Sequence, residues 1–163
     1  MLSTPEYGWT RFQLGQKESY RLSYLTDVAN EWLAQAIHGL ETLDVFSVHG
    51  FCEPGRMVCT VSFWSCYVIL EDDGPAPICE GVNHLHVSMI DFCRQLYADI
   101  SKDLDAWVHW DDDALEDELD ENDGRMLEDL VQERRSGIQA KLDRLKRLIE
   151  ENEECFGEDG LFF

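Results

Sequence analysis

Apolar residues recur at intervals of three and four positions along two segments in the second half of the chain. The first stripe comprises Met89, Phe92, Cys93, Leu96, Ile100, Leu104, Trp107 and Val108. The second comprises Leu127, Leu130, Val131, Ile138, Leu142, Leu145, Leu148 and Ile149. This spacing lines one face of a helix, and a continuous apolar face must be covered by other parts of the protein. We therefore predict two helices within residues 88–154, joined by a charged connector into a C-terminal helical hairpin.

The first half of the chain carries the alternating pattern of β-strands, interrupted by one helix. Residues 9–14 and 19–25 predict a hairpin, because apolar and polar side chains alternate along the second of these segments. Thr26 or Asp27 then offers a side-chain oxygen at a helix N-terminus. The apolar residues that follow have helical spacing, so we expect this helix to end near Thr42.

A second hairpin is predicted from residues 45–52 and 56–70, with Pro54 and Gly55 at the positions that a type II turn favours. The resulting register pairs Cys52 with Met57, Gly50 with Cys59, Val48 with Val61 and Phe46 with Phe63. These side chains form one apolar face, and the opposite, more polar face is expected to be half exposed. Residues 78–87 are predicted to add one more strand.

The elements follow the order ββαβββαα, which indicates an α+β fold. We expect an antiparallel sheet of about five strands, with helices packed on one side. A length of 163 residues suits a single domain. Within it, we expect the sheet and the first helix in residues 1–87, the helix–connector–helix unit in residues 88–154, and a tail in residues 155–163. The apolar end of this tail, residues 160–163, is expected to dock on the protein's own core.

The chain carries a net charge of −21, which is unevenly distributed. Residues 1–70 contain seven acidic and four basic residues, whereas residues 71–123 contain seventeen acidic and two basic residues. A field of this sign repels nucleic acids and anionic membranes and attracts basic proteins. We therefore expect no direct binding to DNA or RNA, no binding to membranes, and a basic protein as the partner.

The sequence also bears on the cellular compartment. It has no run of eighteen apolar residues, and residues 1–6 lack the basic and apolar regions of a signal peptide. Three of the six cysteines, Cys59, Cys66 and Cys93, lie within apolar strand or helix patterns, where a reduced cysteine is a small core residue. We therefore expect a cytoplasmic protein with free thiols.

The connector contains nine acidic residues and no basic residue between Asp111 and Asp123. A calcium-binding EF-hand loop does not fit, because counting from Gly124 places Leu119 and Leu130 at the first and last ligand positions. Three interpretations remain: a solvated acidic surface, a surface that meets a basic partner, or a specific metal site of another kind. The candidate partner-binding residues are Asp111, Asp112, Asp113, Glu116, Asp117, Glu118, Asp120 and Glu121, with Trp107 and Trp110 as apolar anchors.

Other candidate chemistry is sparse. His84 and His86 would share one face of a strand and are the candidate metal ligands, but two ligands do not make a site. Cys66 and His49 could meet across the second hairpin as nucleophile and base. The sequence carries no nucleophile elbow, phosphate-binding loop, dinucleotide fingerprint or kinase signature. We therefore expect no catalytic residues, no metal and no cofactor.

These observations favour a non-catalytic, acidic protein-binding module, either of the inhibitor or immunity type or a nucleic-acid mimic, that engages a basic protein partner. Two alternatives stay open. The first is a structural or assembly protein that forms a homodimer through its helical hairpin. The second is a small hydrolase or metal enzyme, because a nucleophile and a base that are distant in sequence can still meet in space.

Overall fold

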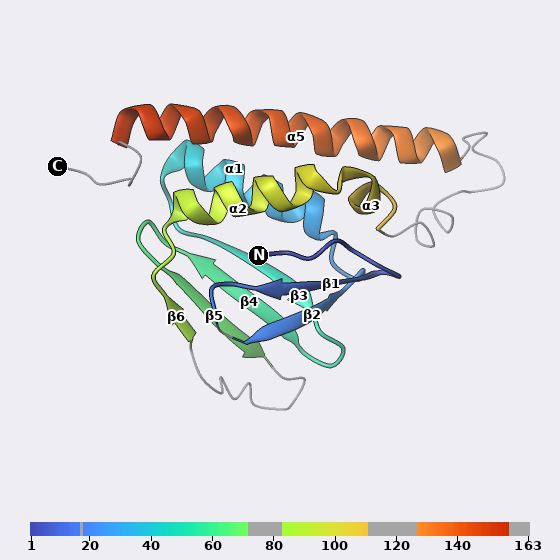
Figure 1. The fold of residues 1–163 in the computed structure, drawn as a ribbon, viewed down its shortest axis with the longest axis horizontal. Helices are drawn as coiled ribbons and strands as arrows, with labels where there is room; N and C mark the ends of the chain where they lie inside the picture. The colour runs from blue at the N-terminus through green and yellow to red at the C-terminus, as the bar shows by residue number, and fades with distance from the viewer. Residues whose placement is uncertain (17, 72–82, 111–126, 157–163) are drawn as a thin grey trace.

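The computed structural model describes residues 1–16, 18–71, 83–110 and 127–156 and shows an α+β fold (Figure 1). Its strands are β1 (Trp9–Gln13), β2 (Ser19–Ser23), β3 (Phe46–Phe51), β4 (Arg56–Val61), β5 (Cys66–Glu71) and β6 (Asn83–Leu85). Its helices are α1 (Val28–Thr42), α2 (Met89–Lys102), α3 (Leu104–Val108) and α5 (Leu127–Phe156). The described strands form an antiparallel pair, β1–β2, and an antiparallel sheet in the order β3–β4–β5–β6. The predicted fold class is confirmed, with one strand more than expected.

The first hairpin and α1 follow the sequence prediction closely. β1 and β2 pair in a register that places Phe12 opposite Tyr20. The Asp27 side chain caps α1, because its carboxylate accepts a hydrogen bond of 3.2 Å from the Asn30 amide. This bond satisfies one of the N–H groups that a helix start leaves without a partner. The helix ends at Thr42, as predicted.

The register of the β3–β4 hairpin differs from the predicted one by two residues. Val48 lies opposite Cys59 instead of Val61. The Cys52 N–H donates to the Gly55 carbonyl at 2.9 Å, so the turn is centred one residue earlier than the predicted type II turn. Because the shift is even, every side chain keeps its predicted face. The buried inner face comprises Phe46, Val48, Gly50, Met57, Cys59 and Val61.

The additional strand arises because the segment predicted as one strand, residues 56–70, folds into β4 and β5. The two strands are joined at Ser62–Ser65, where the Ser62 N–H donates to the Ser65 carbonyl at 2.8 Å. The Ser62 hydroxyl donates to the same carbonyl and accepts from the Ser65 amide. Serine side chains form such turns without glycine or proline. The strand predicted at residues 78–87 is described from residue 83 onward, where β6 pairs with β5.

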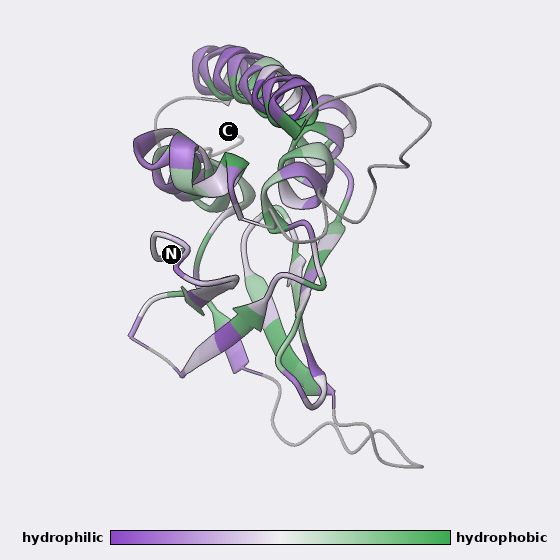
Figure 2. Cartoon of the chain, turned by 90° about the vertical axis from the view of Figure 1, so that its right-hand side faces the viewer, coloured by the Kyte–Doolittle hydropathy of each residue, from purple (hydrophilic) through white to green (hydrophobic). Residues whose placement is uncertain are grey.

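The helices lie on one side of the strands, with α5 outermost over α1 and α2 (Figure 1). The first predicted helix of the C-terminal hairpin is divided at Asp103 into α2 and α3. α5 packs on α1 as well as on α2 and α3, and its outward side is mostly hydrophilic (Figure 2). Its buried apolar residues are Leu130, Ile138, Leu142, Leu145, Leu148 and Ile149. The predicted hairpin is therefore present, and α1 completes its cover.

Aromatic side chains fill the space between the helices and the inner face of the sheet. The Phe12 and Trp32 rings meet edge to face with centroids 5.4 Å apart, and Phe46 and Phe92 do the same at 5.9 Å. Such pairs add to the stabilisation that burial of the rings provides. Buried residues from both halves of the chain belong to this one cluster. The core thus holds α1 against β3, which is the arrangement that forms the candidate site.

Candidate functional site

The acidic candidates between Asp111 and Glu121 lie outside the described residues, so their role stays a prediction. The two tryptophans predicted as apolar anchors have a different place. Trp107 is completely buried and Trp110 is 3% exposed, and their stacked rings have centroids 5.3 Å apart. The Trp110 indole N–H also donates to the Thr26 carbonyl. Both rings are therefore core residues, and this placement corrects the expectation that they contact a partner.

The described basic side chains are largely used within the protein. Seven of them form ion pairs with described acids: Arg56, Arg94, Lys102, Arg134, Arg135, Arg144 and Lys146. Lys141 donates a hydrogen bond of 2.8 Å to Asn30, and the Arg21 guanidinium lies 4.5 Å from the centre of the Trp9 ring. The chain has 34 acidic and 13 basic residues, so this internal pairing leaves the excess carboxylates to set the field around the protein.

α5 supplies many of the cations that hold it against the rest of the protein. Its pairs are Arg134 with Asp27, Arg135 with Asp105, and Arg144 with Glu41. The Arg134–Asp27 pair is the most enclosed of these, with the arginine side chain 11% exposed. Burial raises the pKa of the Asp27 carboxyl, but the hydrogen bonds and charge of Arg134, with hydrogen bonds from Asn30, outweigh it and lower the pKa below its usual 3.8. Asp27 therefore carries its negative charge while it joins two helices.

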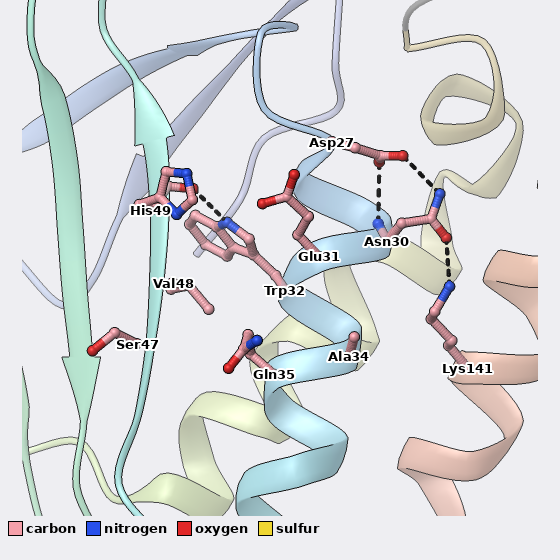
Figure 3. Close-up of a pocket in the computed structure, with 10 residues that line it drawn as sticks. All are labelled: Asp27, Asn30, Glu31, Trp32, Ala34, Gln35, Ser47, Val48, His49 and Lys141. Carbon is pink, nitrogen blue, oxygen red and sulfur yellow. Dashed lines mark hydrogen bonds between the residues drawn. The ribbon is translucent and has the colours of Figure 1, made fainter.

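A groove of about 490 Å³ runs along the N-terminal half of α1 beside β3 (Figure 3). The lining residues are Asp27, Asn30, Glu31, Trp32, Ala34, Gln35, Ser47, Val48, His49 and Lys141. α1 and its cap provide one wall, β3 provides the other, and α5 contributes Lys141. Small-molecule sites are usually enclosed and mainly apolar. Polar and charged side chains line this groove together with apolar surface, so it can form hydrogen bonds and ion pairs with a partner.

The groups in the groove have distinct tasks. The Trp32 indole N–H donates to the His49 carbonyl at 2.8 Å and so fixes α1 to β3. The exposed carboxylate of Glu31 projects from α1 towards β3 (Figure 3). Lys141 is held by Asn30 on the other side of the helix. Glu31 therefore gives the β3 side of the groove an accessible negative charge.

The sequence prediction named Asp27 as a possible helix cap and His49 as a possible base, but it did not group the groove residues into one site. Asp27, Glu31 and Gln35 recur at intervals of four, which places them on one side of the predicted helix. This spacing was the one feature of the sequence that could have indicated the α1 side of the groove. Their neighbours Ser47 and His49 follow from the way α1 turns back along β3, and this juxtaposition cannot be read from spacing along the chain.

The two candidate metal ligands are neighbours at the far side of the sheet. The His84 and His86 rings have centroids 4.7 Å apart, and His84 also stacks on Tyr67 at 5.0 Å. Both histidines are exposed; His84 belongs to β6, whereas His86 follows the end of this strand at Leu85. Within the described part of the chain, no group of three or more histidine, cysteine or acidic side chains is placed to hold a metal ion.

The predicted pairing of Cys66 with His49 is wrong. Cys66 is buried on the inner face of the sheet, where its thiol donates to the Val87 carbonyl, and His49 belongs to the opposite face. A hydrogen bond with Cys66 and burial raise the pKa of Cys59, and burial raises the pKa of Cys93. These two thiols are therefore protonated at neutral pH and are poor nucleophiles.

None of the described helices combines the length and the apolar character needed to cross a membrane. No protein-family model matches the chain, and no characterised protein or solved structure matches it either.

Proposed function

We propose that this protein is a non-catalytic binding module that engages a basic protein partner through its acidic surface, as an inhibitor, an immunity protein or a nucleic-acid mimic. The internal use of the cations carries the proposal, because seven described basic side chains pair with acids of the same chain. Exposed acids such as Glu6, Glu31 and Asp44 form no ion pair with a described residue, and they add to the acidic stretch from Asp111 to Asp123.

A negative field of this kind acts mainly on association. It steers a positively charged partner towards the protein and disfavours partners of the same sign. The reach of the field is about 8 Å at physiological ionic strength, so the association rate should depend strongly on salt. Apolar contacts would come from exposed side chains such as Phe51, Trp64 and Tyr67 instead of from the buried tryptophans.

The two alternative functions are not supported by a specific observation. Dimerisation through the helical hairpin was motivated by its apolar stripes, and these are buried within the chain between α5, α1 and α2. Hydrolase chemistry was motivated by a cysteine–histidine pair, and the two side chains lie on opposite faces of the sheet. Binding of a basic partner is therefore the best supported of the three functions.

Affinity capture from the native host's lysate tests the proposal with three baits. The first is the wild-type protein. The second neutralises the acidic stretch through Asp111→Asn, Asp112→Asn, Asp113→Asn, Glu116→Gln, Asp117→Asn and Glu118→Gln. The third is a charge-matched control that neutralises exposed acids of α5 through Glu128→Gln, Asp129→Asn, Glu133→Gln, Asp143→Asn, Glu151→Gln and Glu154→Gln. The captured proteins are identified, and association rates are then measured with the purified partner.

The wild type and the α5 control should capture the same basic protein, and the variant of the acidic stretch should lose it. The association rate of the captured basic protein with the wild type should fall as salt rises from low to physiological strength. Capture of the same species by all three baits, with equal association rates at every salt concentration, would show that the acidic surface is solvated without being used, and the proposal would be wrong.

A further inference from the structure

The outer edge of β3 has main-chain groups that point away from its sheet. The strand order places β3 at one end of the four-stranded sheet, so it pairs with β4 on one side. On its other side, the Phe51 N–H donates to the Thr26 hydroxyl at 3.3 Å, and the His49 carbonyl accepts from the Trp32 indole. Main-chain groups of alternate residues point the same way in a strand. The N–H and carbonyl of Ser47 therefore also point to this edge.

The edge of β3 borders the groove at Ser47. Ser47 is exposed, and the sheet has no further described strand on this side. The hydroxyl of Thr26, which precedes α1, and the indole of Trp32 in α1 occupy part of this edge, but the groove beside α1 extends past them to Ser47. An edge with unpaired main-chain groups is a template for one more strand. The length available is short, so a bound segment would need a second contact.

Glu31 supplies that second contact. It lines the same groove as Ser47, and its carboxylate projects from α1 towards β3 (Figure 3). Asp27, at the end of the groove, is already paired with Arg134, whereas Glu31 is exposed. A basic side chain on a segment that lies along β3 could therefore reach Glu31 while the segment's main chain pairs with Ser47.

We propose that the groove binds an extended segment of the basic partner, which adds as a short strand to the β3 edge at Ser47 and places a lysine or arginine against Glu31. Main-chain hydrogen bonds would supply affinity, and the Glu31 contact would select the charge of the segment. The sign of the segment's charge rests on the proposed function, whereas the strand addition rests on the geometry of β3.

The probe is a capped ten-residue peptide of alternating lysine and threonine, because threonine favours extended structure and lysine supplies the charge. It is titrated to about millimolar concentration into the isotopically labelled full chain at low salt, a range suited to short-peptide binding. The amide signals of Ser47 and His49 and the indole signal of Trp32 report on the groove. A second peptide of the same sequence, methylated at every backbone nitrogen, keeps the charge but has no N–H to donate.

Two variant pairs separate strand addition from charge. Ser47→Pro removes the outward N–H, and Ser47→Ala keeps it; proline is tolerated in an edge strand where the N–H faces solvent. The first change should weaken peptide binding about tenfold and the second less than about twofold. Glu31→Gln should weaken binding about threefold at low salt, and Glu128→Gln, at an exposed position on α5 outside the groove, should leave it unchanged. If Ser47→Pro does not fold, the Glu31 and Glu128 pair and the methylated peptide decide the question.

Shifts at Ser47, His49 and the Trp32 indole, lost with the methylated peptide, would support the inference. Equal binding by Ser47→Pro and Ser47→Ala, or shifts confined to other residues, would overturn it and leave the proposed function standing, since the acidic surface would then bind the peptide elsewhere. A wild-type dimer that Ser47→Pro converts to a monomer would assign the edge to a second copy and also overturn it. An absence of any shift at millimolar peptide would reject the site, and the lysate capture would judge the proposed function independently.

Discussion

Replacing a helical glycine with alanine should have opposite effects on stability in α1 and α5. At Gly39 in α1, an added Cβ would lie 2.2 Å from Cδ1 and 2.6 Å from Cε1 of the Phe46 ring. Carbon atoms in contact are normally about 3.5 to 4.0 Å apart, so either the ring or the helix would have to move. At Gly137 in α5, an added Cβ would meet no atom within 4 Å. The two positions therefore share the gain in helix propensity and differ in packing.

The magnitudes follow from these two terms. Alanine is favoured over glycine inside a helix by about 0.8 to 1.0 kcal/mol, so Gly137→Ala should raise the free energy of unfolding by about 0.5 to 1 kcal/mol. Overpacking a tight core costs about 1 to 3 kcal/mol. Phe46 is 4% exposed and enclosed by the core, so the upper part of this range applies. Gly39→Ala should therefore lower the free energy of unfolding by about 1 to 2 kcal/mol after the propensity gain.

Urea unfolding followed by tryptophan fluorescence measures both changes, with equal slopes of the transition as the check that the two free energies are comparable. The destabilisation by Gly39→Ala should shrink in a Phe46→Leu background, where the ring is gone. Stabilisation of similar size by both glycine substitutions would refute the close packing of α1 on β3, and with it the wall of the groove.

Three further predictions concern the ion pair, the sheet and the thiols. Arg134→Met should lower the free energy of unfolding by about 2 to 3 kcal/mol at pH 7, whereas the exposed Arg147→Met should lower it by less than about 0.5 kcal/mol. Because Arg134 lowers the pKa of Asp27, the stabilisation by this ion pair is complete above the usual pKa of 3.8 and is lost as pH falls through the lowered pKa. The free energies of unfolding of the two variants should therefore become equal in acid. Denaturation at several pH values measures these free energies, and an equal decrease for Arg134→Met and Arg147→Met at pH 7 would contradict the prediction. Val48→Ala should cost about 1 to 2.5 kcal/mol and Ser47→Ala about 0.5 or less, because the first side chain is buried and the second is exposed; reversed sensitivities in urea unfolding would mean that the faces of β3 are exchanged. Thiol counting in denaturant without reductant should find six free thiols, since the described cysteines are free, and fewer than about four would refute the reduced state.

The elements of this fold were predictable where the sequence pattern is local. The spacing of apolar residues and the capping oxygen of Asp27 gave the start and end of α1, because both signals act within one helical turn. The β3–β4 register was missed by two residues, because Pro54 and Gly55 fit more than one turn and the hydrogen bond from Cys52 to Gly55 decides between them. The faces survived this error, since alternation repeats every two residues.

The candidate site was less predictable than the fold, because it joins residues that are distant in sequence. Tryptophans beside an acidic stretch indicated anchors, but Trp107 and Trp110 face the core at α3, where packing outweighs exposure. The groove needs Glu31 on α1 and Ser47 on β3 to lie together, and this depends on the turn between them and on the bond from Trp32 to His49. Sequence spacing describes one element at a time and cannot show such a contact.

The arrangement of charge on α5 connects the stability of the fold with the field that the protein presents. Arg134 and Arg144 meet acids of α1, and Arg135 meets Asp105 of α3, so these cations face the body of the protein. Most charged residues on the exposed side of α5 are acidic, and Lys146 and Arg147 are the basic residues there. A helix with the reverse arrangement would bring carboxylates against Asp27 and Glu41 and would be repelled. The pairing that attaches α5 therefore also fixes which sign of charge remains outside. Neutralising the inner cations of α5 should therefore lower the free energy of unfolding, whereas neutralising its exposed acids should change the free energy of unfolding little.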